Sequence, residues 1–281
     1  MSTEENVLVS VVIGTKNSAA TLGLCLEAVR KQTYGNLEII VVDNFSDDDT
    51  TTIARGYTET VYEKGPERTA QWNDAIEKSR GECIQILAAD AEMTPEVIAE
   101  CVALYRAGHG MVIIPEKHVG TGFWTRARAL ERECYLGDDT IEAPWFYSKK
   151  GLEKVGGFNE AMFAGEDWDL FNRLKTAGYT YERCHAFIHH HLGHLRFGDA
   201  IRKKYYYGSQ LKSFIRDHRS SSMAKVPLFR MAYIRNWKKL LRHPILSVGF
   251  LTLKFFETIA VALSLVLPRG SRAATPYRKA G

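Results

Sequence analysis

Residues 9–50 read VSVVIGTKNSAATLGLCLEAVRKQTYGNLEIIVVDNFSDDDT, and this stretch decides the expected fold. Its apolar, β-branched beginning predicts a buried strand over 7–15, and LEIIVVD predicts a second one over 37–43. Between the two strands, apolar residues recur at helical spacing and mark one buried helix face: Leu22, Cys25, Leu26 and Val29. The stretch therefore has a strand–helix–strand pattern.

The alternation continues along the chain. Further strands are predicted at 59–63, 82–87 and 111–115, and helices at 48–57, 69–80, from Thr94 to Arg106, and at 166–177. Strands that alternate with helices indicate an α/β fold, in which a mostly parallel sheet is flanked by helices on both faces. Ligands of such sheets bind at the carboxyl ends of the strands.

Two acidic residues stand at predicted strand ends. Asp43 closes LEIIVVD, and Asp90 closes ILAAD. Each is a candidate for ligand binding, and each could equally be an aspartate that only begins a loop. The first strand is followed by GTKNSAATL, which lacks the G-x-G-x-x-G pattern of dinucleotide binding, and the chain has no Walker-type phosphate loop.

Charge divides the chain into two parts. Residues 196–281 carry 18 basic and three acidic side chains, whereas residues 1–195 carry 19 basic and 30 acidic ones. We therefore predict one domain over 1–195 and a helical, basic and aromatic segment over 196–281. An excess of basic charge suits an anionic membrane surface or nucleic acid, and no nucleic-acid-binding motif is present.

The basic segment contains an apolar run, ILSVGFLTLKFFETIAVALSLVL, at 245–267. The run is long enough to cross a bilayer, but Lys254 and Glu257 stand in its middle, where they could pair on a helix. Basic and aromatic residues precede it at 230–243, a pattern typical of interfacial attachment. Interfacial attachment, a spanning helix and a helix packed on protein all stay open.

Composition is that of a globular protein, with 45% hydrophobic and 25% charged residues, which excludes disordered and collagen-like classes. The five cysteines are isolated from one another and form no Cys-x-x-Cys motif, as expected in a reducing compartment. The first ten residues lack the basic start of a secretory signal. We expect a cytoplasmic location.

The ordered motifs of the chain resemble family 2 glycosyltransferases with the GT-A fold. Beyond 9–50, the resemblance rests on four blocks: EKGPERTAQWNDAIEKSRGE (63–82), ILAADAEMTPEV (86–97), GEDWDLFNRLKTAGY (165–179) and FIHHHLG (187–193). The resemblance implies an inverting enzyme of the hexosyltransferase type. It would use a nucleotide-diphosphate sugar, with UDP favoured and GDP possible.

The resemblance also implies a donor site. Asp43 would accept a hydrogen bond from the base, Thr15 and Asn17 would contact the nucleoside, and Arg68 would contact phosphate, as would the block around Asp90. An Mg²⁺ or Mn²⁺ ion would neutralise the diphosphate. The family usually offers Asp-x-Asp, but Ala88 replaces the first acid here, so the expected metal ligands are Asp90, Glu92 and His190, with His191 as the alternative to His190.

The general base that the resemblance implies is Asp167, with Glu166 beside it. The dipole of helix 166–177 would favour the ionised form of Asp167. The other interpretation of GEDWD is an acidic helix start without a catalytic role.

The acceptor site is expected in the aromatic and basic stretch 118–148, at four residues: Trp124, Arg126, Arg128 and Trp145. These residues could equally be core tryptophans and solvated arginines. The expected acceptor is a growing glycan or a lipid-phosphate-linked sugar, at the cytoplasmic face of a membrane. Two alternatives stay open: a nucleotidyltransferase, and a catalytically silent membrane-bound scaffold, which the loss of the acid at Ala88 would suit.

Overall fold

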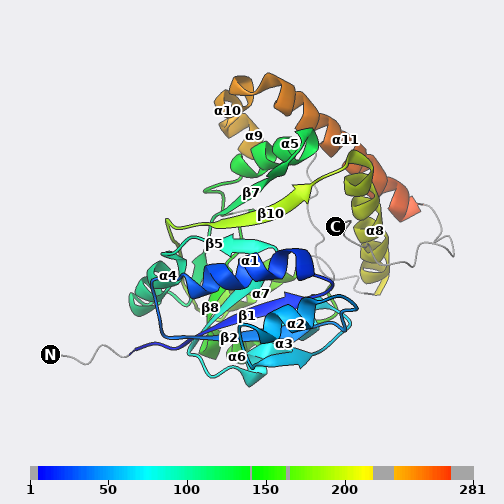
Figure 1. Cartoon of the computed structure of the whole chain (residues 1–281). Helices are drawn as coiled ribbons and strands as arrows, with labels where there is room; N and C mark the ends of the chain where they lie inside the picture. The colour runs from blue at the N-terminus through cyan, green and yellow to red at the C-terminus, as the bar shows by residue number, and fades with distance from the viewer. Residues whose placement is uncertain (1–5, 140, 163–164, 218–230, 267–281) are drawn as a thin grey trace. The chain divides into compact units, whose positions relative to one another are not determined.

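The computed structural model describes residues 6–139, 141–162, 165–217 and 231–266. The chain separates into two compact units (Figure 1). The first comprises residues 1–116, 139–160 and 165–191, and the second comprises residues 117–138, 161–164 and 192–281. The boundary after residue 195, predicted from charge alone, stays a prediction; the second unit also includes the segment 117–138.

A seven-stranded sheet forms the centre of the first unit, in the order β3-β2-β1-β4-β8-β6-β9. Its strands are β1 (Val9–Thr15), β2 (Leu37–Asp43), β3 (Val61–Glu63), β4 (Cys83–Ala88), β6 (Met111–Ile113), β8 (Phe146–Ser148) and β9 (Tyr181–Arg183). All neighbouring strands are parallel except β8, which is antiparallel to β4 and to β6. The predicted α/β fold with a mostly parallel sheet is confirmed.

Helices cover both faces of this sheet (Figure 1). One face packs against α1 (Ala19–Arg30), α2 (Thr50–Arg55) and α4 (Val97–Arg106), and the other packs against α3 (Arg68–Lys78), α6 (Lys149–Val155) and α7 (Glu166–Thr176). Because side chains alternate along a strand, Val11 and Ile13 of β1 join the first core while Val12 joins the second. This burial on both faces explains why β1 is mostly apolar.

The carboxyl ends of the central strands meet at one edge of the sheet. In the parallel register, Thr15 lies opposite Asp43, and Gly14 lies opposite Ala88. A Cβ atom added to Gly14 would lie 3.2 Å from Nε1 of Trp72, so the strand and α3 approach closely here. The fold thus gathers sequence-predicted residues from separate blocks at one edge.

A second, three-stranded sheet has the order β5-β10-β7. Its strands are β5 (Ala91–Met93), β10 (Ile188–His194) and β7 (Glu116–Thr121). In the antiparallel register of β10 with β5, His189 lies opposite Glu92 and His190 opposite Ala91. The sheet therefore brings the histidine block to the block that contains Asp90.

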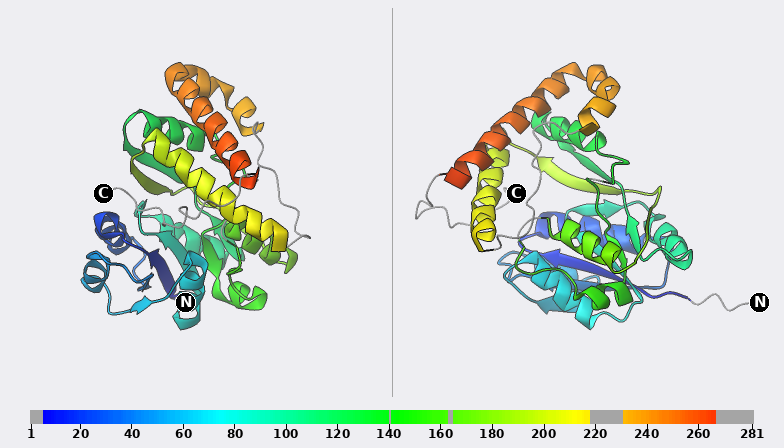
Figure 2. Two further views of the ribbon diagram at one scale, coloured as in Figure 1. Left: turned by 90° about the vertical axis from the view of Figure 1, so that its right-hand side faces the viewer. Right: turned by 180° about the vertical axis from the view of Figure 1, so that it is seen from behind.

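The second unit is mainly helical, with α5 (Phe123–Glu133), α8 (Phe197–Asp217), α9 (Met231–Arg235), α10 (Trp237–Arg242) and α11 (Pro244–Val266). The views from the side and from behind show α11 running along α8 (Figure 2). Helix α11 covers the predicted apolar run except Leu267, which lies outside the described residues, and it is long and apolar enough to cross a membrane by length and composition.

Candidate active site

The loops after β1 and β2 are held together by the carboxylate of Asp43, which is buried. Thr15 Oγ1 donates to Asp43 Oδ1 at 2.7 Å, and Ser46 donates to the same carboxylate from both its backbone N–H and its hydroxyl, each at 2.6 Å. Asn17 joins this network, because its N–H donates to Ser46 Oγ and its Oδ1 accepts from the N–H of Asp47. The structure therefore brings Thr15, Asn17 and Asp43 together.

Gln71 is a buried member of this edge that the sequence pattern did not single out. Its Nε2 donates to the carbonyl oxygens of Thr15, at 2.9 Å, and Val42, at 2.6 Å. A side chain on α3 thus ties the ends of β1 and β2 to each other. The only sequence signal was its place in the block 63–82.

Asp167 and Glu166 begin α7, next to the start of α3. Arg68 of α3 forms an ion pair with Oε1 of Glu166, while Oε2 of Glu166 is buried and has no hydrogen-bond partner among the described residues. Oδ1 of Asp167 accepts from the backbone N–H of Trp168 at 2.9 Å. The guanidinium of Arg68 is about half exposed, so it is also open to solvent.

Burial, and next the negative charge of Glu166, raises the pKa of Asp167 to about 6. The N–H of Trp168 and the charge of Arg68 act in the opposite direction but are weaker. The start of α7 was expected to favour the ionised form of Asp167. The net effect in the structure is the opposite, because burial and the charge of Glu166 raise the pKa of Asp167. A carboxyl group with such a pKa changes protonation state near neutral pH, as a general base must.

Tyr147, on β8, was also missed by the sequence analysis. Its pKa is raised above its ordinary value by burial and by the negative charges of Asp167 and Glu166. Its hydroxyl donates to the carbonyl oxygen of Pro144. The hydroxyl of Tyr147 therefore stays neutral, and the charges of Asp167 and Glu166 act on it.

In β10, which we call the histidine strand, successive histidine side chains pair with different acids. His190 Nε2 lies 3.2 Å from Asp90 Oδ1. Glu92 Oε2 lies 2.8 Å from His191 Nε2 and 3.9 Å from His189 Nδ1. Of the three predicted metal ligands, the structure brings Asp90 and His190 together and places Glu92 with the other two histidines.

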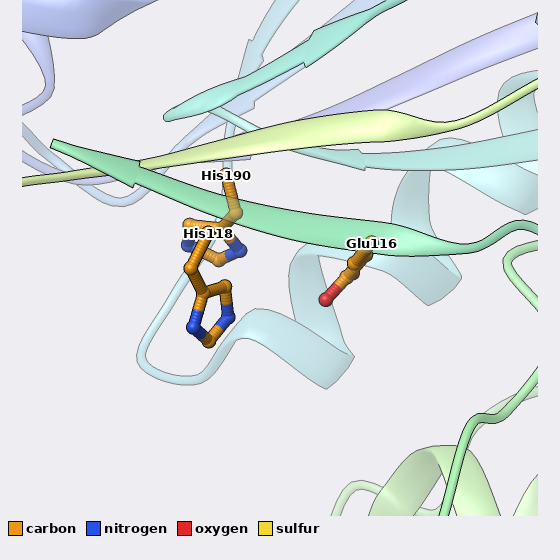
Figure 3. Close-up of side chains that lie close together, drawn as sticks. All are labelled: Glu116, His118 and His190. Carbon is orange, nitrogen blue, oxygen red and sulfur yellow. The ribbon is translucent and has the colours of Figure 1, made fainter. Parts of the chain in front are cut away.

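The pair formed by Asp90 and His190 suits a divalent cation, because it combines a carboxylate oxygen with an imidazole nitrogen. Figure 3 shows His190 with Glu116, a second residue of the first unit, and the ligand atoms of these two side chains lie within 4.8 Å of each other. Glu116 was missed because it lies before the stretch in which acceptor residues were sought.

The four predicted acceptor residues have different surroundings. Trp145 packs edge-on against Trp72, with ring centroids 6.0 Å apart, in the first unit. In the second unit, Trp124 packs on Phe197, with centroids 4.8 Å apart, and Arg126 is exposed on α5. Arg128 is largely buried and forms ion pairs with Glu131 and Glu257.

With this geometry in view, comparison with known proteins identifies the family. The family profile "Glycosyl transferase family 2" matches residues 10–165, which is more than half of the chain. The chain belongs to glycosyltransferase family 2. A second profile, described as the N-terminal domain of galactosyltransferase, matches residues 145–195 and so includes α7 and the whole histidine strand.

Curated relatives agree with this assignment. The glycosyltransferase AglE of Haloferax volcanii is 27% identical over 223 residues, which cover 71% of each chain. A PGL/p-HBAD biosynthesis glycosyltransferase from Mycobacterium tuberculosis is 37% identical over 176 residues, 57% of this chain and 67% of that protein. The match to an uncharacterised protein of Sinorhizobium fredii, 28% identical over 220 residues and 63% of this chain, spans only 23% of that protein's length.

Solved structures share the fold. The mannosyltransferase PcManGT of Pyrobaculum calidifontis, solved with GDP-Man and Mn²⁺, superposes with a TM-score of 0.60 at 19% identity, covering 92% of this chain and 87% of that one. TarS of S. aureus superposes with a TM-score of 0.53 at 17% identity, covering 92% of this chain and 54% of that one. The fold of this family 2 glycosyltransferase is therefore of the GT-A type.

Proposed function

We propose that this glycosyltransferase moves a sugar, with inversion, from a nucleotide-diphosphate donor to a growing glycan or a lipid-linked acceptor at the cytoplasmic face of a membrane. The observation that carries the proposal is Asp167, a carboxylate at the start of α7 whose pKa burial and Glu166 raise to about 6. At neutral pH this group is mostly ionised, yet it is basic enough to remove a proton from an acceptor hydroxyl.

Glu166 has a supporting role in this proposal. Its charge keeps the pKa of Asp167 high, and its ion pair with Arg68 fixes the start of α7 relative to α3. The half-exposed Arg68 would also contact donor phosphate. Inversion follows if Asp167 activates the acceptor for a single displacement at the anomeric carbon.

Donor binding is assigned to the edge formed by Thr15, Asn17 and Asp43. The structures similar to this chain were solved with GDP-Man and with UDP-GlcNAc, so both bases stay candidates and we favour UDP. Asp90 and His190 would hold an Mn²⁺ or Mg²⁺ ion, with Glu92 as a further carboxylate nearby. When bound, that ion neutralises negative charge that develops on the departing diphosphate.

Trp124 and Arg126 of the second unit and Trp145 of the first stay separate candidates for acceptor contacts. We do not extend this role to Arg128, because Glu131 and Glu257 already bind its guanidinium. A relative from Campylobacter jejuni, 24% identical over 189 residues, 60% of each chain, is named as a glucosyltransferase that acts on an undecaprenol-linked glycan. A lipid-linked acceptor is therefore the first class to test.

A catalytically silent protein is the second candidate, and a specific residue favours it. Ala88 ends β4 where the family usually has its first metal-binding acid. In that case nucleotide would bind without a metal requirement, and no sugar would be transferred. The nucleotidyltransferase alternative loses its support, because the chain belongs to a family of glycosyltransferases.

The deciding experiment measures transfer from UDP- and GDP-sugars to polyprenyl-diphosphate-linked acceptors by Asp167→Asn and by the unmodified protein. We expect the substitution to lower turnover by about 10²- to 10⁴-fold, the range of general-base catalysis. Calorimetric binding of UDP and GDP, with and without Mn²⁺, should be unchanged by it. Asp169→Asn is the matched control. Asp169 lies two residues after Asp167 on the same helix, and its Oδ2 pairs with Arg173 at 2.7 Å. Equal losses in both variants would contradict the base role of Asp167.

A further inference from the structure

Helix α11 has two faces of different character. Its buried face carries small, apolar and acidic side chains: Ser247, Gly249, Phe250, Leu253, Glu257, Ala260 and Ser264. Its opposite face exposes a stripe of large apolar side chains, which apart from the adjacent Phe255 and Phe256 follow at intervals of three or four residues: Ile245, Val248, Leu251, Phe255, Phe256, Ile259, Leu263 and Val266. Such spacing places them along one side of a helix. We call this set the outer stripe.

The charged residues of α11 belong to its inner side. Lys254 Nζ lies 2.6 Å from Oε1 of Glu131 on α5 and 3.6 Å from Oε2 of Glu257. Glu257 in turn pairs with Arg128 of α5. All four groups lie within the second unit, so the charges that interrupt the apolar run are neutralised by protein.

Close packing fixes this inner side against two helices. A Cβ atom added to Gly249 would lie 2.5 Å from Cζ of Phe123 on α5. One added to Gly208 of α8 would lie 3.2 Å from Cα of Val261 and still closer to the hydroxyl of Ser264. Figure 2 shows the resulting side-by-side course of α8 and α11. One side of α11 therefore packs against α5 and α8, and the other side exposes apolar side chains that can contact a further apolar environment.

The surroundings of the outer stripe are basic. Helices α9 and α10 expose further large apolar side chains, at Met231, Ile234, Trp237 and Leu241. They also expose the basic residues Arg235, Lys238 and Arg242. The sequence has no acidic residue from 218 to 256. Apolar and aromatic side chains combined with an excess of basic charge are complementary to an anionic lipid surface.

We propose that the outer stripe of α11 lies in the plane of an anionic bilayer, inserted in one leaflet, while its inner face stays on α5 and α8. This inference deepens the membrane attachment in the proposed function and does not depend on the sugar-transfer chemistry. At about 1.5 Å per residue the helix is about 35 Å long, so length alone would permit spanning. Spanning would, however, carry Lys254 and Glu257 into hydrocarbon or separate them from Arg128 and Glu131.

Vesicle flotation tests the attachment. The intact protein is mixed with vesicles of equimolar phosphatidylglycerol and phosphatidylcholine, or of phosphatidylcholine alone. We expect it to float with the anionic vesicles, and Val248→Glu/Ile259→Glu to reduce the floating fraction at least tenfold. Leu24→Glu is the matched control, because Leu24 is an exposed apolar residue on α1 of the first unit, 44% exposed. Flotation of the double variant at the level of the unmodified protein would overturn the proposal.

Two readouts separate this inference from other outcomes. Nucleotide binding by calorimetry should be the same in all three proteins; a protein that floats but transfers no sugar would refute the proposed function and leave the inference standing. Sedimentation without vesicles tests a second copy as the occupant. Self-association that the double variant abolishes, in a protein that does not float, would refute the lipid assignment.

Depth measurements distinguish one-leaflet insertion from spanning. Spin labels are placed on single cysteines introduced along the exposed positions of α11, since the five native cysteines are buried. Because these exposed positions lie along one side of the helix, one-leaflet insertion predicts a similar, shallow depth at all of them from 245 to 266. A depth that increases steadily to the middle of the helix and then decreases would show a spanning helix and overturn the proposal.

Discussion

Two largely buried acidic sites in this protein, one in each unit, have opposite electrostatics. In the first unit, Asp167 has Glu166 as its neighbour, and burial together with that negative charge raises its pKa to about 6. In the second unit, Glu131 is also buried, but Lys254 and Arg128 lower its pKa to about 2. Burial alone therefore does not determine the state of a carboxyl group; the charge of its neighbours does.

The difference separates a reactive acid from a structural one. Glu131 is held ionised by two cations and by the hydroxyl of Tyr135, which donates to its Oε1 at 2.5 Å. Asp167 accepts a backbone N–H bond, and its acidic neighbour takes the ion pair with Arg68. A proton can thus be exchanged at Asp167 near neutral pH, whereas Glu131 exchanges none.

The largest expected effect concerns the structural site. Glu257→Ala should destabilise the protein by about 3–5 kcal/mol, because Arg128 and Lys254 then remain as buried cations with one acid between them. Urea unfolding at pH 7, followed by tryptophan fluorescence, measures the change. Arg202→Ala is the control, since Arg202 pairs with Asp199 on the solvent-exposed side of α8. A loss no larger than in this control would show that the cluster contributes little.

The pH dependence of stability sharpens the comparison at Glu131. Its pKa is lower in the folded state, so the stability it contributes is present above pH 4.5 and is lost as the pH falls toward 2. We expect Glu131→Gln to cost about 2–3 kcal/mol at neutral pH, and less at each step below pH 4. Unfolding curves of both proteins at several pH values measure this; a constant difference would contradict the assignment.

Asp167 should respond with the opposite sign. Its pKa is higher in the folded state, so the native protein binds more protons than the unfolded chain between about pH 4 and 6, and its stability falls as the pH rises through this interval. Asp167→Asn should therefore stabilise the protein above pH 6 by about 1–2 kcal/mol, allowing for the partial exposure of the side chain. Below pH 4 the gain should disappear. Destabilisation at pH 7 would place Asp167 among the structural acids.

The features that could be predicted from the sequence are those that depend on local periodicity. The strands and helices of the first unit follow from local periodicity, and β1, β2, α1 and α7 lie where the pattern put them, within a few residues. The alternation of His189, His190 and His191 about β10 follows from the period of a strand. The pairing of Lys254 with Glu257, three residues apart, was also predicted and is confirmed.

What the sequence did not predict depends on contacts between distant segments. Arg128 was expected at the acceptor because arginine binds phosphate, but its partner Glu257 is 129 residues away and no local pattern joins them. Gln71 and Tyr147 acquire their surroundings only when α3 packs on the sheet and β8 pairs with its neighbouring strands. The raised pKa of Asp167 likewise follows from tertiary burial, which outweighs the local dipole that the sequence indicated.

The smallest expected effect is a shift of the activity profile in Glu166→Gln. The substitution removes the charge that raises the pKa of Asp167 and also releases Arg68, whose positive charge lowers it. Both changes favour ionised Asp167, so the rise of kcat/KM with pH, expected near 6, should move to lower pH while the maximal rate is largely kept. Asp169→Asn, which changes the partner of Arg173 on α7, should leave the profile in place. A profile that stays near pH 6 in Glu166→Gln would mean that burial alone sets the pKa of Asp167. The contrast between the two sites would then depend on the cations beside Glu131 and not on Glu166 beside Asp167.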